Sequence, residues 1–248
     1  MKKGSAANTV FTGLMVAGLS VGLMGVASGC KTGGCPCAAR CPANKEIKQM
    51  SNAEFYTNGK FDSAKAKQAY FDLMRKFHVP VYAALQKDDN YFWAVDFAKG
   101  DFASFGMGGV IWVNEKQEGY FGHDIYLLPG QSIAEHRHLP TTDKDGKQIR
   151  CKIESWLVRD GWVYGFSEIG EPNLAQFPEA QKMLSKVQIP YLKSVHVEKW
   201  VADGQAHKLP APESWHFMMG GSEGAIVTEF ATYHDGNGLR FSVPGVGF

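Results

Sequence analysis

Short runs rich in β-branched and aromatic residues recur from residue 109 onward, and turn motifs separate them. The runs are GVIWV (109–113), DIYLLP (124–129), CKIESWLV (151–158), GWVYGFSE (161–168), SVHVEKWV (194–201) and AIVTEFATY (225–233). The motifs RDGW, ADGQ, GGSEG and DGNG between or after them contain the Gly, Asp and Asn residues that favour tight turns. The pattern predicts a sandwich or small barrel of antiparallel strands.

Two other stretches have helical patterns. In 62–77, DSAKAKQAYFDLMRKF places apolar residues at helical spacing behind a capping Asp or Ser, and HVPV then ends the helix. A second short helix is expected over 177–186, FPEAQKMLSK, where Pro178 suits a first helical turn. We therefore expect a mainly β domain with a few peripheral helices.

The first 29 residues have the charge layout of an export signal. Lys2 and Lys3 precede an uncharged stretch, and small residues stand just before Cys30. The motif VASGC resembles a bacterial lipoprotein signal, which implies a lipid on Cys30. Cleavage after Ala27 as a soluble-secretion signal is one alternative, and an uncleaved anchor of about 20 residues is another. All three place the domain outside the cytoplasm, in the periplasm or at the cell surface.

Residues 30–50 contain four of the five cysteines, at positions 30, 35, 37 and 41. Their spacing lacks the paired C-x-x-C units of zinc sites, so disulfides in an oxidising compartment are the favoured interpretation. The Gly, Pro and Ala residues around them favour a flexible tether. The remainder, 51–248, is expected to form one domain because β domains of this length need not be split.

The formal net charge is only +1, and no basic stripe is interleaved with aromatic residues. We therefore expect no nucleic-acid partner.

The motif AEHRH contains a histidine pair with metal-ligand spacing. Residues i and i+2 of a strand share a face, so His136 and His138 are expected to point one way and Arg137 the other. By the same rule Lys152 and Glu154 share a face in the strand that follows. If that strand pairs with the one bearing the histidines, Glu154 can join the two imidazoles around an ion.

A further histidine, His216 in PESWHF, stands near the start of a late strand and would complete a His₃Glu cage with open positions for substrate. This donor set suits manganese, iron, nickel or zinc. Each histidine taken alone is more often a hydrogen-bonded or exposed residue than a ligand, and the combination of positions is what favours a metal.

Lys152 would lie close to the cation, which disfavours protonation of the amine and predicts a lowered pKa. A neutral amine could pass a proton or hydrogen-bond an oxyanion. A salt bridge with Glu154 or another acid is the alternative.

The motifs H-x-H, then K-x-E followed by LVRDGWVYGF, then PESWHF and finally VTEFA before DGNGLRF occur in this order. With WAVDFAKGDFASFGMGGVIWV ahead of them, they resemble the D-lyxose isomerases of the cupin superfamily over roughly residues 75–245. The resemblance implies a cupin-type antiparallel β-barrel (jelly roll), an aldose–ketose isomerase for D-lyxose- or D-mannose-like sugars, Mn²⁺ as cofactor, and a homodimer.

The resemblance also implies roles for individual residues. The matches are His136, His138, Glu154 and His216 as metal ligands, Lys152 and Glu229 as catalytic residues, and Asp235 and Arg240 near the sugar-binding positions. Asp235 and Arg240 are equally compatible with a role as hairpin residues. Three features depart from the family: the insertion between His138 and Lys152, Ser155 in place of an acid, and the export signal.

The expected reaction removes the C2 proton of an open-chain sugar to give a cis-enediol, with Glu229 or Lys152 as the base, and returns a proton to C1. Two other functions fit the same residues. A non-heme iron cupin oxygenase needs the same cage, and a surface lipoprotein could bind sugars without turnover.

Overall fold

Two long antiparallel strands, β9 (Glu154–Ser167) and β12 (His216–Thr232), organise the computed structural model, which describes residues 48–87, 91–97 and 100–247. The other strands are β1 (Tyr56–Thr57), β2 (Lys60–Phe61), β3 (Trp93–Asp96), β4 (Gly106–Glu115), β5 (Tyr120–Leu127), β6 (His136–His138), β7 (Thr141–Thr142), β8 (Gln148–Ile149), β10 (His196–Val201), β11 (Ala206–Lys208) and β13 (Leu239–Phe241). The helices are α1 (Ser63–Lys76), α2 (Ala83–Lys87) and α3 (Pro178–Met183), with short 3₁₀ turns η2 (Asn52–Glu54), η3 (Leu174–Gln176), η4 (Ile189–Tyr191) and η5 (Gly236–Gly238).

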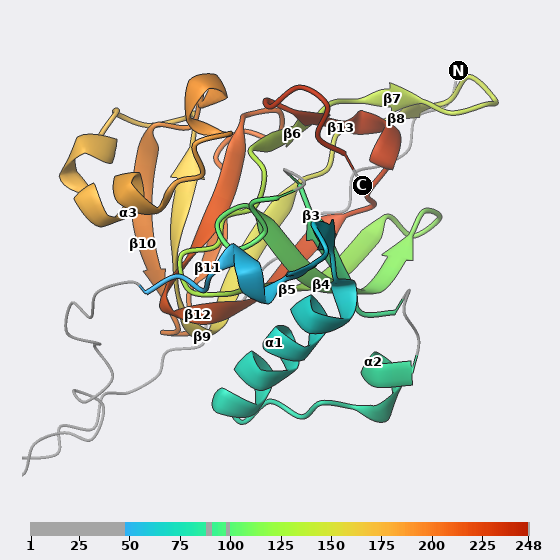
Figure 1. Ribbon diagram of the computed structural model, residues 1–248. Helices are drawn as coiled ribbons and strands as arrows, with labels where there is room; N and C mark the ends of the chain where they lie inside the picture. The colour runs from blue at the N-terminus through green and yellow to red at the C-terminus, as the bar shows by residue number, and fades with distance from the viewer. Residues whose placement is uncertain (1–47, 88–90, 98–99, 248) are drawn as a thin grey trace, which may run out of the picture. The chain divides into compact units, whose positions relative to one another are not determined.

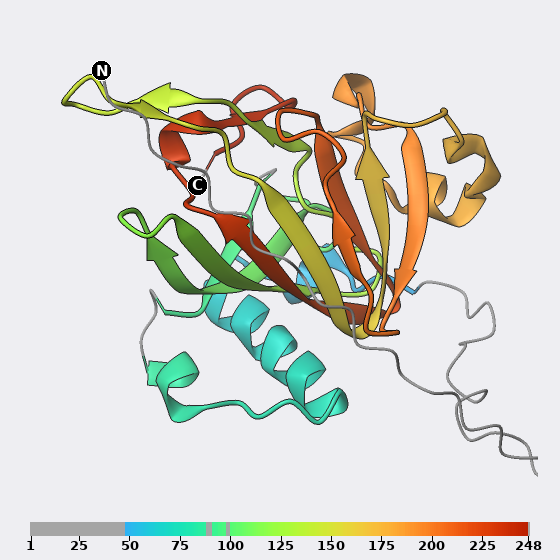
Figure 2. The same cartoon turned by 180° about the vertical axis from the view of Figure 1, so that it is seen from behind.

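The main sheet runs in the order β10-β9-β12-β5-β4-β3, with β11 on the edge of β9 and β6 joining β12 to β13. Residues 225–232 of β12 pair with β5, and residues 225–231 also pair with the first half of β9. Residues 216–220 pair instead with the second half of β9, and His216 pairs with β6. The two long strands therefore belong to both walls of a curled sheet (Figures 1 and 2). This is the antiparallel barrel that the sequence predicted.

Two of the predicted turns are wrong, because RDGW and GGSEG lie inside β9 and β12. Each marks a bend at which the strands change walls, and the register shifts between Gly220 and Ala225. Gly161 has φ +70°, and a Cβ there would lie 2.1 Å from the Gly224 carbonyl oxygen. Glycine thus permits a bend that a side chain would block, and pairing between β9 and β12 resumes at Ala225 and Gly161.

The two faces of the curled sheet are both covered. Ile125, Val227 and Val158 stand in register across three strands and are buried in the larger core. On the opposite face, α1 packs against β3 and β4 and buries Tyr70, whose hydroxyl donates to the Gln131 side chain at 2.7 Å. Alternation of apolar residues along each strand produces this two-sided burial.

The predicted helices are present. Asp62 caps α1 by accepting a hydrogen bond from the Lys65 backbone N–H, which confirms the predicted start. The second helix begins at Pro178 as predicted but ends at Met183, earlier than expected. The polar segment 139–150 forms the β7–β8 hairpin, and its Asp143 accepts backbone hydrogen bonds within the turn.

Within the described ranges, no helix is both long and apolar enough to span a membrane. The predicted signal (1–29), Cys30 and most of the predicted tether lie outside those ranges.

Candidate active site

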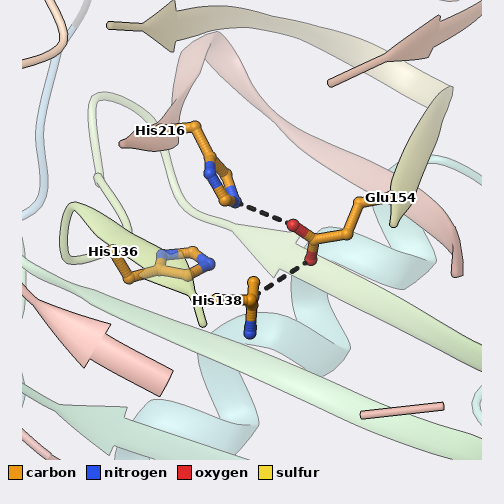
Figure 3. Close-up of side chains that lie close together, drawn as sticks. All are labelled: His136, His138, Glu154 and His216. Atoms are coloured by element: carbon orange, nitrogen blue, oxygen red, sulfur yellow. Dashed lines mark ion pairs between the residues drawn. The ribbon is translucent and has the colours of Figure 1, made fainter. Parts of the chain in front are cut away.

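The structure brings together the four residues that the sequence predicted as metal ligands (Figure 3). His136 and His138 lie on β6, Glu154 begins β9 and His216 begins β12. One ligand atom from each of the four lies within 4.8 Å of those from the other three. Donors on opposite sides of a cation bound at about 2.1 Å are roughly 4.2 Å apart, so the cluster has dimensions close to those of a metal centre.

The bend of the β9–β12 ladder produces this convergence. His216 and Glu229 lie on the same strand and would be roughly 43 Å apart if that strand were flat. In the barrel, Glu154 links them: its Oε2 is 3.0 Å from His216 Nε2, and its Oε1 is 2.8 Å from Lys152, which contacts Glu229. β6 pairs with β12 and β13 rather than with β9, so Glu154 reaches the histidines across the barrel and not from a neighbouring strand.

Backbone carbonyls hold two of the imidazoles. His136 Nδ1 is 2.9 Å from the Ala134 carbonyl oxygen, and His216 Nδ1 is 2.9 Å from that of Ser214. An N–H at Nδ1 leaves the lone pair at Nε2 directed toward the cluster, which is the arrangement found in metal-binding histidines.

Three buried polar atoms of the cluster make no hydrogen bond among the described residues: Nε2 of His138, Nε2 of His216 and Oε2 of Glu154. Their close polar contacts are within the cluster, where the Glu154 carboxylate lies 3.3 Å from His138 Nε2 and 3.0 Å from His216 Nε2. Buried polar groups are normally satisfied, so such a set of converging acceptors favours a bound cation.

The electrostatics favour the metal-binding forms of three of the four residues: His136, His138 and Glu154. Burial lowers the pKa of His136 well below its usual value, and burial also lowers the pKa of His138. Burial opposes ionisation of Glu154, but Lys152, His138 and His216 outweigh it and hold the pKa of this carboxyl well below its usual value. The pKa of His216 is raised, because Glu154 outweighs the effect of burial. The carboxylate is therefore ionised beside two neutral imidazoles.

Lys152 lies next to the cluster and bridges two carboxylates. Its Nζ is 2.8 Å from Glu154 Oε1, contacts Glu229 Oε1, and lies 4.2 Å from the centre of the Phe121 ring. The predicted lowering of its pKa depends on a bound cation and stays a prediction. Among the protein's own groups, burial lowers the pKa of Lys152, but Glu154 and Glu229 outweigh burial and raise it. The salt bridge that the sequence left as an alternative is present.

Two histidines of the site were not predicted. His123 Nδ1 is 3.5 Å from Glu229 Oε2, and the His123 ring stacks on Trp93 with centroids 5.4 Å apart. The sequence pattern that could have revealed His123 is the two-residue alternation of Phe121, His123 and Ile125, which all face inward from β5.

His234 follows β12, where no strand periodicity predicts its direction. Its ring centroid is 5.2 Å from that of His138, and burial lowers its pKa to about 4.

Asp235 and Arg240 make the local contacts of a turn. Asp235 caps η5 by accepting from the Asn237 N–H and from the Thr141 hydroxyl. Arg240 donates to the carbonyls of Asn237 and Leu239, both at 2.7 Å. Neither residue lines the cavity described next, and their role in sugar binding stays a prediction.

The cluster opens into a cavity of about 1320 Å³. Lys152, Glu229, His123 and His234 line it together with the candidate metal ligands, and apolar side chains make up most of the remaining wall. A large, mainly apolar cavity with a few convergent polar groups is typical of a small-molecule site.

Comparison with known proteins agrees with this geometry. No family model matches the chain. A D-lyxose/D-mannose isomerase of Thermosediminibacter oceani is 29% identical over 181 residues, which cover 70% of this chain and 92% of the relative. A D-lyxose ketol-isomerase of Cohnella laeviribosi is 31% identical over 137 residues, which cover 55% of this chain and 68% of the relative.

Solved structures support the fold. An L-ribose isomerase of Cellulomonas parahominis with L-ribose superposes with a TM-score of 0.50 at 15% identity, over 73% of this chain and 90% of that one. An L-ribose isomerase of an Acinetobacter species with L-ribose also gives 0.50, at 14% identity, over 74% and 84%. The barrel is of the cupin type, and the chain belongs to the D-lyxose ketol-isomerase family of sugar isomerases.

Proposed function

We propose that the protein is a metal-dependent aldose–ketose isomerase that acts on D-lyxose- and D-mannose-like sugars through a cis-enediol. One observation carries the proposal: three imidazoles and the Glu154 carboxylate converge beside the buried Lys152–Glu229 pair. Relatives named for D-lyxose and D-mannose support the substrate class.

His136, His138, Glu154 and His216 would hold the cation, and the convergence of one ligand atom from each of them within 4.8 Å fits that role. A donor set of three imidazoles and one carboxylate accepts several divalent metals, and Mn²⁺ is the one that the family resemblance implies. When bound, such a cation polarises the carbonyl and acidifies the adjacent C–H of the sugar.

The contacts of Glu229 support a role as the base. Lys152 contacts its Oε1, and His123 approaches its Oε2 at 3.5 Å, so the carboxylate is held between two side chains. We assign to a Glu229 oxygen the removal of the C2 proton, which leaves the enediol, and the return of that proton to C1. No atom is gained or lost in this exchange.

Lys152 complements the base. Its ammonium group lies between the ligand Glu154 and the base Glu229, where it can donate hydrogen bonds to the oxygens that become negative as the C2 proton leaves. A donor fixed in a buried site stabilises this charge more than water would, because it needs no reorganisation.

The proposal is tested with the full chain, stripped of metal by a chelator and reloaded with Mn²⁺. Chromatography measures fructose formed from D-mannose and xylulose formed from D-lyxose. We expect both ketoses from the loaded protein and neither from the stripped protein.

Absence of ketose across an aldose panel, with one metal per chain bound, would overturn the proposal and favour sugar binding without turnover. Oxygen consumption measured with an electrode would instead favour an iron oxygenase.

A further inference from the structure

The cavity continues past the metal cluster along β10, and polar and aromatic side chains of that strand line it. His196, Glu198 and Trp200 alternate along β10 and line the cavity, while Val197 is buried on the opposite face. Core-facing positions of a strand are normally apolar. Polar and aromatic side chains on the cavity side therefore indicate a wall built to contact a ligand.

This wall is aligned with the metal cluster. His196 pairs with Ser167 on β9, Ser167 pairs with His216 on β12, and His216 pairs with His136 on β6. Residues opposite each other in paired strands face the same side of a sheet. The strands β10, β9 and β12 lie side by side in both views (Figures 1 and 2). The wall and the candidate ligands thus share one continuous surface.

Aromatic rings connect the two ends of that surface. The Trp156 ring lies 5.4 Å from His216 and stacks on Trp200, centroid to centroid, at 5.7 Å with an interplanar angle of 20°. Trp200 in turn stacks on His207 of β11 at 4.5 Å and 14°. Trp156, Trp200, His207 and His216 all line the cavity, as does Glu198. We call Trp156, Glu198, Trp200 and His207 the aromatic wall.

The position of Trp200 is fixed from two sides. A Cβ at Gly165 would lie 2.3 Å from the Trp200 ring. The ring therefore packs directly on the β9 backbone, and a side chain at position 165 would displace it. The Trp200 indole N–H donates to Glu198 Oε2 at 2.9 Å. A platform held in this way loses little conformational freedom when a ligand binds.

We propose that the aromatic wall binds a second, neutral sugar unit, so that the enzyme accepts disaccharides with an aldose at their reducing end. This inference rests on the proposed function. Pockets for drug-sized ligands measure roughly 300–1,000 Å³, whereas this cavity measures about 1320 Å³. One monosaccharide at the metal cluster would leave the wall uncovered.

The chemistry of the wall matches a neutral glycosyl unit. Gly165 and His207 lie against the Trp200 indole, but Trp200 and His207 both stay partly exposed. The apolar C–H groups of a pyranose can pack against the uncovered parts of these rings. An ionised carboxylate has acceptor capacity for several donors, so Glu198 can accept sugar hydroxyls in addition to the Trp200 N–H. The same negative charge disfavours a phosphorylated or acidic sugar at this place.

The reaction would be the same isomerisation. The C2 hydrogen of the reducing-end aldose moves to C1, and the hydroxyl proton at O2 is transferred to O1. The glycosidic bond is untouched, and no co-reactant is consumed. The linkage must leave C1 and C2 of that unit free, as a bond to O4 does.

The test compares β-1,4-mannobiose with D-mannose on the Mn²⁺-loaded full chain, by kcat/KM and by titration calorimetry. We expect mannobiose to bind at least about tenfold more tightly and to yield a keto-disaccharide. The variants Trp200→Ala and Glu198→Gln should each lower the ratio of the two kcat/KM values, by about tenfold for the tryptophan. Trp112→Ala, at an exposed position on β4 outside the cavity, is the matched control and should leave the ratio unchanged.

Mannobiose binding no more tightly than mannose would overturn the inference, as would an unchanged ratio in both Trp200→Ala and Glu198→Gln. The second variant changes an exposed side chain, so it keeps the test valid if Trp200→Ala does not fold. Failure of the proposed function is distinguishable, because it abolishes ketose from D-mannose itself, while calorimetry still measures the binding of both sugars.

Discussion

Lys152 and Glu229 form a buried ion pair although 77 positions separate them in the sequence. Lys152 lies two residues before the start of β9, Glu229 lies on β12, and Glu154 contacts the same ammonium group. The cluster thus carries one amine between two carboxylates beside the candidate metal ligands. This relationship makes the amine the first side chain to test.

Lys152→Met should lower kcat on D-mannose by about 10²–10⁴-fold, because the donor that faces the developing negative charge is lost. Bound metal, measured by elemental analysis, should stay near one ion per chain. Lys199→Met is the control. Lys199 of β10 lies over the Trp162 ring of β9, and this variant should keep its activity. Loss of metal together with activity in Lys152→Met would contradict the assignment.

His138→Ala should weaken Mn²⁺ binding by at least about 100-fold, since it removes a donor of the cluster. His234→Ala is a sharp comparison, because this histidine is half-buried and packs on His138 but lies outside the donor set. It should retain one ion per chain. Equal metal loss in both variants would mean that packing, rather than ligation, explains the effect.

Mn²⁺ should raise the thermal midpoint of the wild-type chain, because an ion that binds only the folded state stabilises it by about 2.7 kcal/mol at a concentration 100 times its Kd. Scanning calorimetry of stripped and reloaded protein measures this difference. His138→Ala should show little or no rise at the same concentration, and a rise equal to that of the wild type would argue against the four-residue centre.

Tyr70→Phe should lower the free energy of unfolding by about 1–2 kcal/mol. The variant removes a buried hydroxyl that donates to Gln131 between α1 and the barrel. Urea denaturation measures the change. Tyr82→Phe, whose parent side chain is 58% exposed, should be neutral, and a comparable loss in both variants would contradict a specific role for the buried hydrogen bond.

We propose that the protein is exported and that a lipid on Cys30 anchors it to a membrane, in the periplasm or at the cell surface. Cells grown with a labelled fatty acid should yield labelled protein in the membrane fraction, and Cys30→Ser should abolish the label. Unlabelled wild-type protein would favour one of the other two signal types: a soluble product starting at Ser28 indicates secretion, and an intact amino terminus indicates an anchor.

Local periodicity predicted much of the site. The two-residue repeat of a strand placed His136 with His138 and Lys152 with Glu154, and the structure shows both pairs converging on one cluster. The capping preference of aspartate placed the start of α1 at Asp62. These predictions succeeded because the determining interactions lie within a few residues.

The features that failed depend on distant contacts. RDGW contains turn residues, yet Gly161 bends a continuous strand because Gly224 of the neighbouring strand passes close to it. Glu154 and then Glu229 raise the pKa of Lys152 against the effect of burial, and the approach of Glu229 across the barrel is a contact that spacing along β9 cannot show. His234 lies beyond the end of β12, where no periodicity predicts the direction of a side chain.

The candidate donors come from both ends of one bent ladder, since His216 begins β12 and Glu154 lies opposite Ala231 near its other end. An ion bound by both His216 and Glu154 would crosslink the two ends of the β9–β12 pair. Local unfolding of either end then requires the ion to dissociate. In the metal-bound protein, the amides of residues 216–220 and 154–158 should therefore exchange with deuterium as one cooperative unit.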